Sequence, residues 1–432
     1  MPSLERKLNE KSAVVGIVGL GYVGLPLAVA FSEAGFKVLG FDIRQKNVDS
    51  VNKGQSYIAD VDSERLSAAV ARRLLEATTD QSRLKEVDAI CVCVPTPLTK
   101  TKEPDLSHVI YESEQISSYL QPGQLVVLES TTHPGTTSEV MLPILERSGL
   151  RGGQDFYVAY SPERVDPGSK SYNIANTPKL VGGIDSRSTR LAELLYSQVA
   201  EVVVPVSSPE VAEMTKVFEN VFRSVNISLV NELTLLCYKM GISVWEVIDA
   251  AASKPFGYMP FYPGPGIGGH CIPLDPYYLA NKAREYDFHT RFIELAADIN
   301  EQMPYYVASR ITDALNSTGK SLKGAKVLVM GAAYKKDVGD DRESPSLRLI
   351  QLLREKSADL SYNDPYLGEI QVAEDTLKSV EITDELLSSA DCVVIATDHS
   401  CYDYRHITDK AALVFDTRGA TRKLKGNNIV RL

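Results

Sequence analysis

A glycine-rich loop near the start of the chain constrains the fold more than any other feature. The loop reads Gly19-Leu-Gly-Tyr-Val-Gly24, follows a short apolar segment at residues 13–18 and leads into an amphipathic stretch at residues 26–33. A second apolar segment at residues 37–41 ends at Asp42. A strand, a glycine loop that opens a helix, and a second strand form the first unit of a dinucleotide-binding Rossmann domain. The chain is therefore predicted to begin with such a domain.

The three glycines and Asp42 each suit a different part of a dinucleotide. Gly19 permits the tight turn, Gly21 lets the backbone approach a pyrophosphate, and Gly24 allows close helix packing. The amides of the helix N-terminus attract the phosphates. Asp42 is placed to accept hydrogen bonds from both ribose hydroxyls, and its charge repels a 2′-phosphate. NAD is therefore predicted rather than NADP, although Arg44 argues the other way; a glycine loop that binds no nucleotide is the alternative.

Later parts of the chain repeat the alternation of strand and helix. Apolar segments at 89–94, 125–128 and 156–160 alternate with helical stretches, which predicts a parallel sheet. The C-terminal third resembles the opening: 326–331 is similar to 14–19, 391–396 to 88–93, and 413–416 to 125–128. We expect a second Rossmann-like domain there, without the full glycine fingerprint.

A long helix is predicted between these regions. Residues 210–240 contain no glycine or proline, and their apolar residues recur at steps of three and four. Such a helix is about 46 Å long and is expected to bridge domains and carry a subunit interface, an ordinary core helix being the alternative for the interface part. The predicted fold class is α/β, with two Rossmann-like domains with parallel sheets joined by a long central helix. The predicted domains are 1–206, 207–315 and 316–432.

Charge and cysteine content exclude several classes of function. The formal net charge of −10 disfavours nucleic-acid binding. Six cysteines without a CxxC motif are typical of reduced thiols, so a cytoplasmic protein is expected. The chain has no apolar run of about 18 residues, so no membrane span is predicted. The histidines show no metal-ligand spacing, and no metal site is expected.

A second glycine-rich segment precedes Cys271. The sequence from Pro263 to Cys271 places four glycines before the cysteine, which predicts a backbone that passes close to a ligand. A thiolate attacks an aldehyde to give a thiohemiacetal, which can lose hydride to a second NAD. Asp275 supplies a nearby carboxylate. An unreactive loop cysteine is the alternative.

Further polar residues suit a nucleotide or an oxyanion. Glu213, Lys216, Asn220 and Arg223 are spaced to share one face of the long helix, although spacing alone favours a solvated charged stripe. The segments 130–137 and 161–164 follow predicted strands, where ligand-binding loops belong, with ordinary turns as the alternative. Candidate pyrophosphate partners in the C-terminal domain are Lys335, Arg342 and Arg418, each of which is otherwise a surface charge.

Taken together, these segments resemble the UDP-glucose/UDP-N-acetylhexosamine 6-dehydrogenase family. The shared blocks are GLGYVGLP (19–26), PTP (95–97), ESTTHPGTT (129–137), SPER (161–164), GIGGHCIPLDPYYL (266–279), AYKKDVGDDRESP (333–345) and FDTRG (415–419). The resemblance implies an NAD domain, a long central helix, a UDP-binding domain and a homodimer formed through that helix. It also implies oxidation of a sugar 6-hydroxyl to a carboxylate with two NAD, in the supply of polysaccharide precursors.

The resemblance assigns roles residue by residue. It implies that Cys271 is the nucleophile, that Lys216 is an acid/base or oxyanion partner, and that Thr131 and Glu163 position and activate the water that hydrolyses a thioester. Asn220 and Asp275 would support the oxyanion and the thiol. The implied NAD contacts are Gly19, Gly21, Tyr22, Val23, Gly24, Asp42, Thr96 and Thr131. The implied UDP-sugar contacts are Glu163, Arg164, Val165, Lys216, Asn220, Arg223, Gly268, Lys335 and Arg418.

The sugar is inferred from one departure. UDP-glucose enzymes commonly carry Arg-Ile-Gly before the cysteine loop, where this chain has Lys254-Pro-Phe-Gly257. The segments 261–276 and 289–296 look more like the N-acetylhexosamine branch, so UDP-N-acetylglucosamine is the predicted substrate. UDP-N-acetylgalactosamine, UDP-N-acetylmannosamine and UDP-glucose stay open. Two other readings are a two-electron hydroxyacid dehydrogenase, which needs no thiol, and a nucleotide-sensing protein without catalysis.

Overall fold

The computed structural model describes residues 3–58, 60–99, 102–165, 171–269 and 272–432. Two compact units divide the chain. The first contains Met1–Glu219 and Tyr277–Phe288, and the second contains Asn220–Pro276 and His289–Leu432. Helix α8 (Pro209–Met240) and helix α10 (Asp275–Arg284) each contribute residues to both units. The expected long helix is confirmed, while the division into three domains at 206 and 315 stays a prediction.

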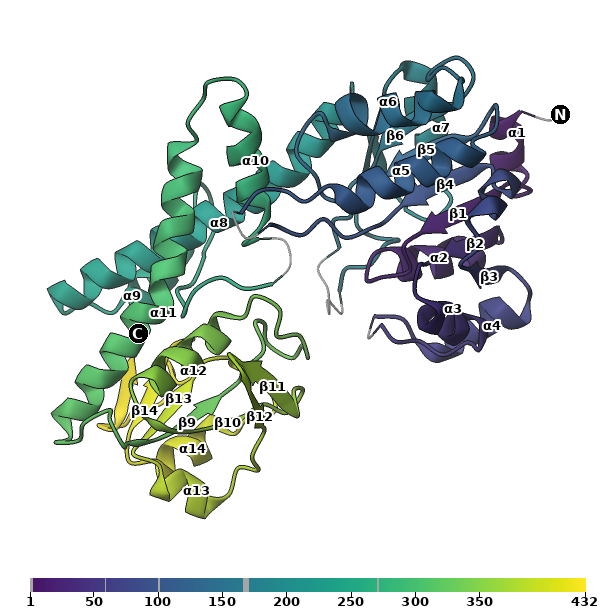
Figure 1. The fold of residues 1–432 in the computed structure, drawn as a ribbon. Coiled ribbons are helices and arrows are strands. Elements are labelled where there is room, and N and C mark those ends of the chain that lie inside the picture. The colour runs from purple at the N-terminus through teal and green to yellow at the C-terminus, as the bar shows by residue number, and fades with distance from the viewer. Residues whose placement is uncertain (1–2, 59, 100–101, 166–170, 270–271) are drawn as a thin grey trace. The chain divides into compact units, whose positions relative to one another are not determined.

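The first unit is built on an eight-stranded sheet with the order β3-β2-β1-β4-β5-β6-β7-β8 (Figure 1). Its strands are β1 Val14–Val18, β2 Lys37–Phe41, β3 Leu75–Thr78, β4 Ala89–Val92, β5 Leu125–Leu128, β6 Tyr157–Tyr160, β7 Lys179–Gly183 and β8 Val203–Pro205. Its helices are α1 Leu4–Asn9, α2 Gly24–Glu33, α3 Gln45–Asn52, α4 Ser63–Ala71, α5 Ser107–Tyr119, α6 Leu142–Leu145 and α7 Ser186–Tyr196, with short helices η1 Gln81–Glu86, η2 Thr136–Met141 and η3 Glu146–Ser148.

The strands consist almost entirely of apolar residues because both faces of this sheet are buried. In β4, Ala89 and Cys91 belong to one hydrophobic cluster, whereas Ile90 and Val92 belong to another. The residues of β5 alternate between the same two clusters. Successive side chains of a strand point to opposite faces, so helices must cover both sides, as in a doubly wound fold.

One strand departs from the predicted parallel sheet. All pairs from β3 to β6 are parallel, but β7 runs antiparallel to β6, with Tyr160 opposite Gly182. Neither β7 nor β8 was predicted from the sequence pattern. The reversal matters for the site, because it places the first residue of β7 at the edge of the sheet where β4, β5 and β6 end.

The second unit contains a five-stranded parallel sheet with the order β10-β9-β13-β14-β15. Its strands are β9 Lys326–Met330, β10 Asp359–Asn363, β13 Cys392–Ile395, β14 Val414–Asp416 and β15 Ile429–Arg431, with a hairpin of β11 Glu369–Val372 and β12 Asp375–Lys378. Its helices are α9 Val244–Ala252, α11 Arg291–Ser317, α12 Pro345–Glu355, α13 Asp384–Ser389 and α14 Tyr404–Lys410. The second Rossmann-like domain is therefore confirmed.

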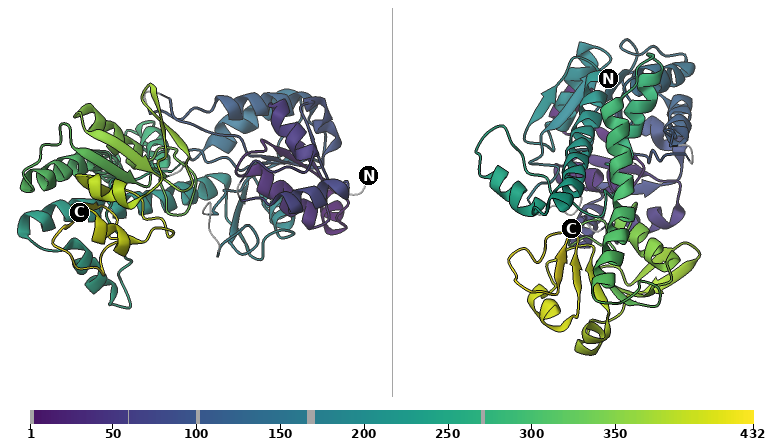
Figure 2. Two further views of the ribbon diagram at one scale, coloured as in Figure 1. Left: turned by 90° about the horizontal axis from the view of Figure 1, so that it is seen from below. Right: turned by 90° about the vertical axis from the view of Figure 1, so that its left-hand side faces the viewer.

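Helices cover both faces of this second sheet. Residues of α11 and α12 form one cluster with β9 and β13, and residues of α13 and α14 form a second cluster with the alternate residues of the same strands. The second half of α8 also contacts α11, since Asn231 Nδ2 donates to Asn300 Oδ1 at 2.9 Å. Figure 2 gives two further views of the ribbon. Among the described residues, no helix has both the length and the apolar character that a membrane span requires.

Candidate active site

The glycine loop has the geometry expected of a dinucleotide site. Gly19 has a φ of +89°, and a Cβ atom on Gly24 would lie 1.9 Å from the carbonyl oxygen of Gly19. These two glycines are therefore required by the fold of the turn itself. A Cβ atom on Gly21 would meet nothing within 4 Å. The space at Gly21, beside the first turn of α2, leaves the backbone open to the approach of a phosphate group, so the loop is compatible with NAD.

Asp42 lies at the end of β2 and holds the glycine loop in place. Its carboxylate is buried and accepts hydrogen bonds from Leu20 N at 3.2 Å, Arg44 N at 2.8 Å and Asn47 Nδ2 at 3.1 Å. A carboxylate has about four acceptor positions. Three donors leave room for one further hydrogen bond, so Asp42 is partly committed to the loop.

The loops after β4 and β5 are tied together. Thr96 Oγ1 donates to Thr131 O at 2.6 Å, and Tyr278 OH from α10 donates to Thr96 O. These two strands are neighbours in the sheet, so both predicted NAD-contacting threonines lie at its carboxyl edge. Tyr22 of the glycine loop is 51% exposed.

Glu213 anchors the segment 135–137 to α8. Its buried carboxylate accepts from Gly135 N at 2.6 Å, Thr137 N at 2.9 Å and Thr137 Oγ1 at 2.7 Å. Burial raises the pKa of Glu213 to about 7, against the opposing effect of these three donors. Lys216, one turn further along, is also buried. The solvated stripe favoured by spacing alone is therefore wrong for these two residues.

Glu163 follows β6 and is held by the backbone and by charge. Its Oε1 accepts from Arg164 N at 2.7 Å and Val165 N at 2.6 Å, while its Oε2 lies 3.4 Å from Lys179 Nζ. Burial raises the pKa of the Glu163 carboxyl, but Lys179, the two N–H donors and Lys216 outweigh it and lower the pKa. Glu163 is therefore an ionised carboxylate at neutral pH, as a group that activates water must be.

Arg164 is bound by protein groups in this structure. Its Nη2 and Nε donate to the Glu219 carboxylate at 2.5 and 3.2 Å, and its Nη1 donates to Pro178 O at 2.7 Å. Val165 contributes the backbone N–H that reaches Glu163. The predicted contact between Arg164 and a UDP-sugar stays a prediction.

In the second unit, Asn220 and Asp275 are brought together. Asn220 Nδ2 donates to Asp275 Oδ2 at 2.5 Å, and Asp275 is buried. Arg223, on the same helix, is exposed. The two residues assigned to the oxyanion and the thiol thus form one hydrogen-bonded pair, next to the segment that follows Cys271.

The glycines before Cys271 pack against protein. A Cβ atom on Gly264 would lie 2.6 Å from Arg418 Nη1, and one on Gly268 would lie 2.6 Å from Tyr334 Cβ. Gly269 N donates to Arg342 O at 3.2 Å. The groups that pack closely against Gly264 and Gly268 in this structure are therefore Arg418 and the loop after β9. The predicted approach of a ligand to this backbone stays a prediction. Lys335 lies half-buried in that loop.

Cys271 and His270 lie outside the described residues, and the assignment of Cys271 as nucleophile stays a prediction. The other five cysteines are free, and only Cys401 is exposed among them. Within the described ranges, no cluster of three or more His, Cys, Asp or Glu side chains is arranged to hold a metal ion.

Three buried polar residues beside Glu163 were missed by the sequence analysis. Glu129 follows β5, Lys179 begins β7, and Tyr196 ends α7; Lys179 Nζ lies 2.6 Å from Glu129 Oε2, and Tyr196 OH donates to Glu129 Oε1 at 2.5 Å. The signal that could have found Glu129 and Lys179 is their place at the ends of apolar strands. A charged residue that is buried at such a place is almost always paired with an opposite charge.

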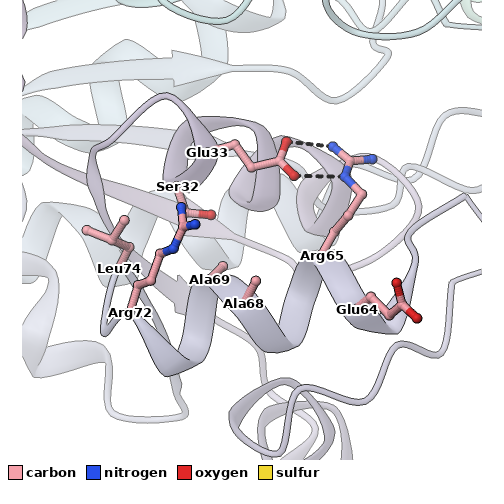
Figure 3. A pocket seen from close by; sticks show the side chains of 8 residues that line it. All are labelled: Ser32, Glu33, Glu64, Arg65, Ala68, Ala69, Arg72 and Leu74. Atoms are coloured by element: carbon pink, nitrogen blue, oxygen red, sulfur yellow. Dashed lines mark hydrogen bonds and ion pairs between the residues drawn. The ribbon is translucent and has the colours of Figure 1, made fainter.

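The first unit also has a surface hollow, which Figure 3 shows from close by. It is lined by Ser32, Glu33, Glu64, Arg65, Ala68, Ala69, Arg72 and Leu74. Arg65 binds the Glu33 carboxylate through two hydrogen bonds at 2.8 and 2.6 Å. Because α2 starts at the glycine loop and ends at Glu33, the hollow lies at the other end of α2 and contains no predicted site residue.

Comparison with known proteins gives matches along most of the chain. Residues 13–200, 210–302 and 328–423 match the NAD binding, central and UDP binding domains of the UDP-glucose/GDP-mannose dehydrogenase family. A UDP-N-acetyl-D-mannosamine dehydrogenase of Pyrococcus horikoshii is 36% identical over 89% of each chain. A UDP-N-acetyl-D-glucosamine 6-dehydrogenase of Pseudomonas aeruginosa is 36% identical over 90% of this chain and 91% of the relative. A solved structure of the Pyrococcus horikoshii UDP-D-ManNAc dehydrogenase superposes with a TM-score of 0.88, at 33% identity over 97% of this chain and 98% of that one. The chain therefore belongs to the UDP-glucose/GDP-mannose dehydrogenase family, and NAD is its cofactor.

Proposed function

We propose that this protein oxidises the 6-hydroxyl of UDP-N-acetylglucosamine to the carboxylate, with two NAD consumed per sugar. The observation that carries the proposal is the Glu163 carboxylate, which lies 3.4 Å from Lys179 Nζ and accepts from Val165 N, at the sheet edge where Thr131 also lies. A two-electron dehydrogenase has no thioester to hydrolyse and has no use for such a group. The departure at residues 254–257 and relatives named for UDP-N-acetyl-D-glucosamine support the sugar.

The chain's own groups supply the steps as follows. Lys216 stabilises the developing alkoxide and aldehyde oxygen, and Cys271 adds its thiolate to the aldehyde to form a thiohemiacetal. NAD, when bound at the glycine loop, would supply the hydride acceptor for both oxidations. The second oxidation leaves a thioester on Cys271. Glu163 then takes a proton from a water molecule, which attacks the thioester, releases the thiolate and leaves the sugar carboxylate. Asn220 and Asp275 support the oxyanion and the thiol.

UDP-N-acetylmannosamine is a second candidate substrate. Relatives from Pyrococcus horikoshii and Methanococcus maripaludis carry the name UDP-N-acetyl-D-mannosamine dehydrogenase at 36% and 33% identity. The epimers differ only in the direction of one substituent at C2, so the same chemistry serves both.

A panel of UDP-sugars tests the substrate and the reaction class together. The purified protein is incubated with NAD and each of UDP-N-acetylglucosamine, UDP-N-acetylmannosamine, UDP-N-acetylgalactosamine and UDP-glucose, and NADH is followed by absorbance. We expect two NADH per sugar with UDP-N-acetylglucosamine, and no acid from Cys271→Ser. One NADH per substrate with insensitivity to iodoacetamide would identify a hydroxyacid dehydrogenase instead. NAD binding without turnover of any UDP-sugar would identify a sensing protein.

We also propose that the protein is a cytoplasmic homodimer formed through α8. Seven apolar residues of this helix are more than a third exposed: Val211, Met214, Phe218, Phe222, Leu229, Leu236 and Met240. They recur at steps of three, four and seven, so they share one side of the helix. A second copy of the chain, meeting the same face, removes this apolar surface from water. The cytoplasm is supported by the free cysteines.

A further inference from the structure

A buried charge network lies behind Glu163 in the first unit. Lys179 is 4% exposed and Glu129 is 1% exposed. The ammonium of Lys179 lies 2.6 Å from Glu129 Oε2 and 3.4 Å from Glu163 Oε2. Tyr196 OH donates to the other oxygen of Glu129. The Lys179 ammonium therefore lies between two carboxylates: that of Glu129, which is fully buried, and that of Glu163, whose side chain is 18% exposed.

Strand direction explains how this lysine reaches the site. Tyr160 of β6 pairs with Gly182 of β7 in antiparallel register. Continuing that register beyond the end of β6 brings residue 163 opposite residue 179. In a parallel β7, the first residue would lie at the other edge of the sheet, far from the loops after β4 and β5. The reversal of β7 is thus what supplies a cation at this position.

The two carboxylates respond differently to Lys179. Burial dominates at Glu129, and its pKa is raised; at Glu163 the cations and N–H donors outweigh burial, and its pKa is lowered. Lys179 is itself buried, but Glu129 and Glu163 hold its pKa above the ordinary value. The titratable groups acting on Glu163 are Lys179 on β7, Glu129 after β5, Lys216 on α8 and the Cys93 thiol after β4.

We propose that Lys179 is a positioning residue for Glu163, fixing the orientation and the negative charge of its carboxylate, with Glu129 and Tyr196 holding the lysine in turn. The role in catalysis rests on the proposed function, in which Glu163 activates the water that hydrolyses the thioester. Lys179 touches neither the substrate nor the reacting atoms in this scheme. Its effect reaches the reaction through the protonation state of Glu163.

The test compares substitutions that change the charge balance in opposite directions. Lys179→Met keeps an unbranched apolar side chain as far as the Cε position and removes the ammonium, so Glu163 should protonate about one pH unit or more higher. Glu129→Gln retains an oxygen that can accept from Tyr196 OH but removes the negative charge of Glu129. Glu163 is then the only carboxylate paired with Lys179, so Glu163 should protonate at the same or a lower pH. A purely structural role would impair both variants alike. The double variant Glu129→Gln with Lys179→Met also removes the buried Glu129 carboxylate that Lys179→Met alone would leave unpaired, and it covers the case in which Lys179→Met does not fold.

The first readout needs no substrate. The carboxyl stretch of glutamate is titrated by infrared spectroscopy on protein carrying ¹³C-labelled glutamate, and the spectrum of Glu163→Gln is subtracted to isolate Glu163. An upward shift in Lys179→Met or in the double variant, and none in Glu129→Gln, supports the proposal. An unchanged titration in both variants that lack Lys179 overturns it.

The second readout is the pH dependence of the hydrolysis step. In rapid-mixing experiments Lys179→Met should form two NADH per active site as the parent does. Subsequent turnover should then fall about tenfold for each pH unit by which Glu163 is shifted, at pH values below its new pKa, and recover at higher pH. A shifted infrared titration with unchanged hydrolysis would refute the role given to Glu163 while the control of its charge by Lys179 stands.

The chain offers a matched control for general damage. Lys282 is also a buried lysine between two carboxylates in the same unit, 2.6 Å from Glu139 Oε2 and 2.7 Å from Glu285 Oε2. Lys282→Met should lower stability without moving the titration of Glu163. A shift of equal size in Lys282→Met would show that the effect is not specific to Lys179 and would overturn the proposal.

Discussion

Individual glycines of the nucleotide loop serve different purposes, and substituting each by alanine distinguishes these purposes. Gly21→Ala places its Cβ in open space, so the melting temperature should stay near that of the parent. NAD affinity should fall about tenfold, because the methyl group would occupy the position proposed for the pyrophosphate. Gly24→Ala forces a contact with Gly19 O and should cost about 1–3 kcal/mol of stability or more. Calorimetric unfolding and NAD titration separate the two outcomes. Unaltered NAD affinity in Gly21→Ala would contradict the placement of the pyrophosphate.

At Glu213, the raised pKa of about 7 links stability to pH. The folded pKa lies above the unfolded value of 4.5, so the contribution of this group is complete below pH 4.5 and is lost as the pH rises through 7. The melting temperature should therefore fall between pH 5 and pH 8, and Glu213→Gln should flatten that fall. Scanning calorimetry across this range measures the slope.

Glu112 provides the comparison, since burial followed by the charge of Asp42 raises its pKa to about 7 as well. Glu112→Gln should remove its own share of the slope, leaving the share of Glu213. If Glu213→Gln kept the full slope of the parent, the link between Glu213 and pH-dependent stability would be wrong.

At the scale of elements, the sequence predicted those strands and helices that depend only on the spacing of residues close together in the chain. The strand before Gly19, the helix after Gly24 and the glycine-free helix ending at Met240 all follow from short-range spacing. The direction of β7 depends on pairing with β6, a contact distant in sequence, and the position of Lys179 depends on that direction. The burial of Glu213 and Lys216 was missed for the same reason, since spacing on a helix does not reveal which neighbour covers a face.

The loops after β4 and β5 act as one element through the hydrogen bond from Thr96 to Thr131 O. Thr96→Val keeps the shape of the side chain but removes the donor, at a cost of about 1 kcal/mol, so the KM for NAD should rise severalfold. Thr96→Ser retains the hydroxyl and should restore most of the affinity. Steady-state kinetics with varied NAD provide the measurement. Equal KM values for the valine and serine variants would mean that this hydrogen bond does not position the NAD loops.

At the scale of the whole molecule, we propose that a second copy of the chain covers the exposed apolar face of α8. Phe218 and Leu229 are 62% and 60% exposed, and burying a side chain of this size contributes about 1.5–3 kcal/mol. Phe218→Glu combined with Leu229→Glu should convert the proposed dimer to a monomer, because the twofold interface would bury these carboxylates close to the same carboxylates of the second copy. Sedimentation velocity over a range of concentrations gives the mass directly. Glu232→Gln, at an exposed position of the same helix, is the control and should remain dimeric. A parent protein that sediments as a monomer at every concentration, or a double variant that stays a dimer, would show that α8 does not form the interface.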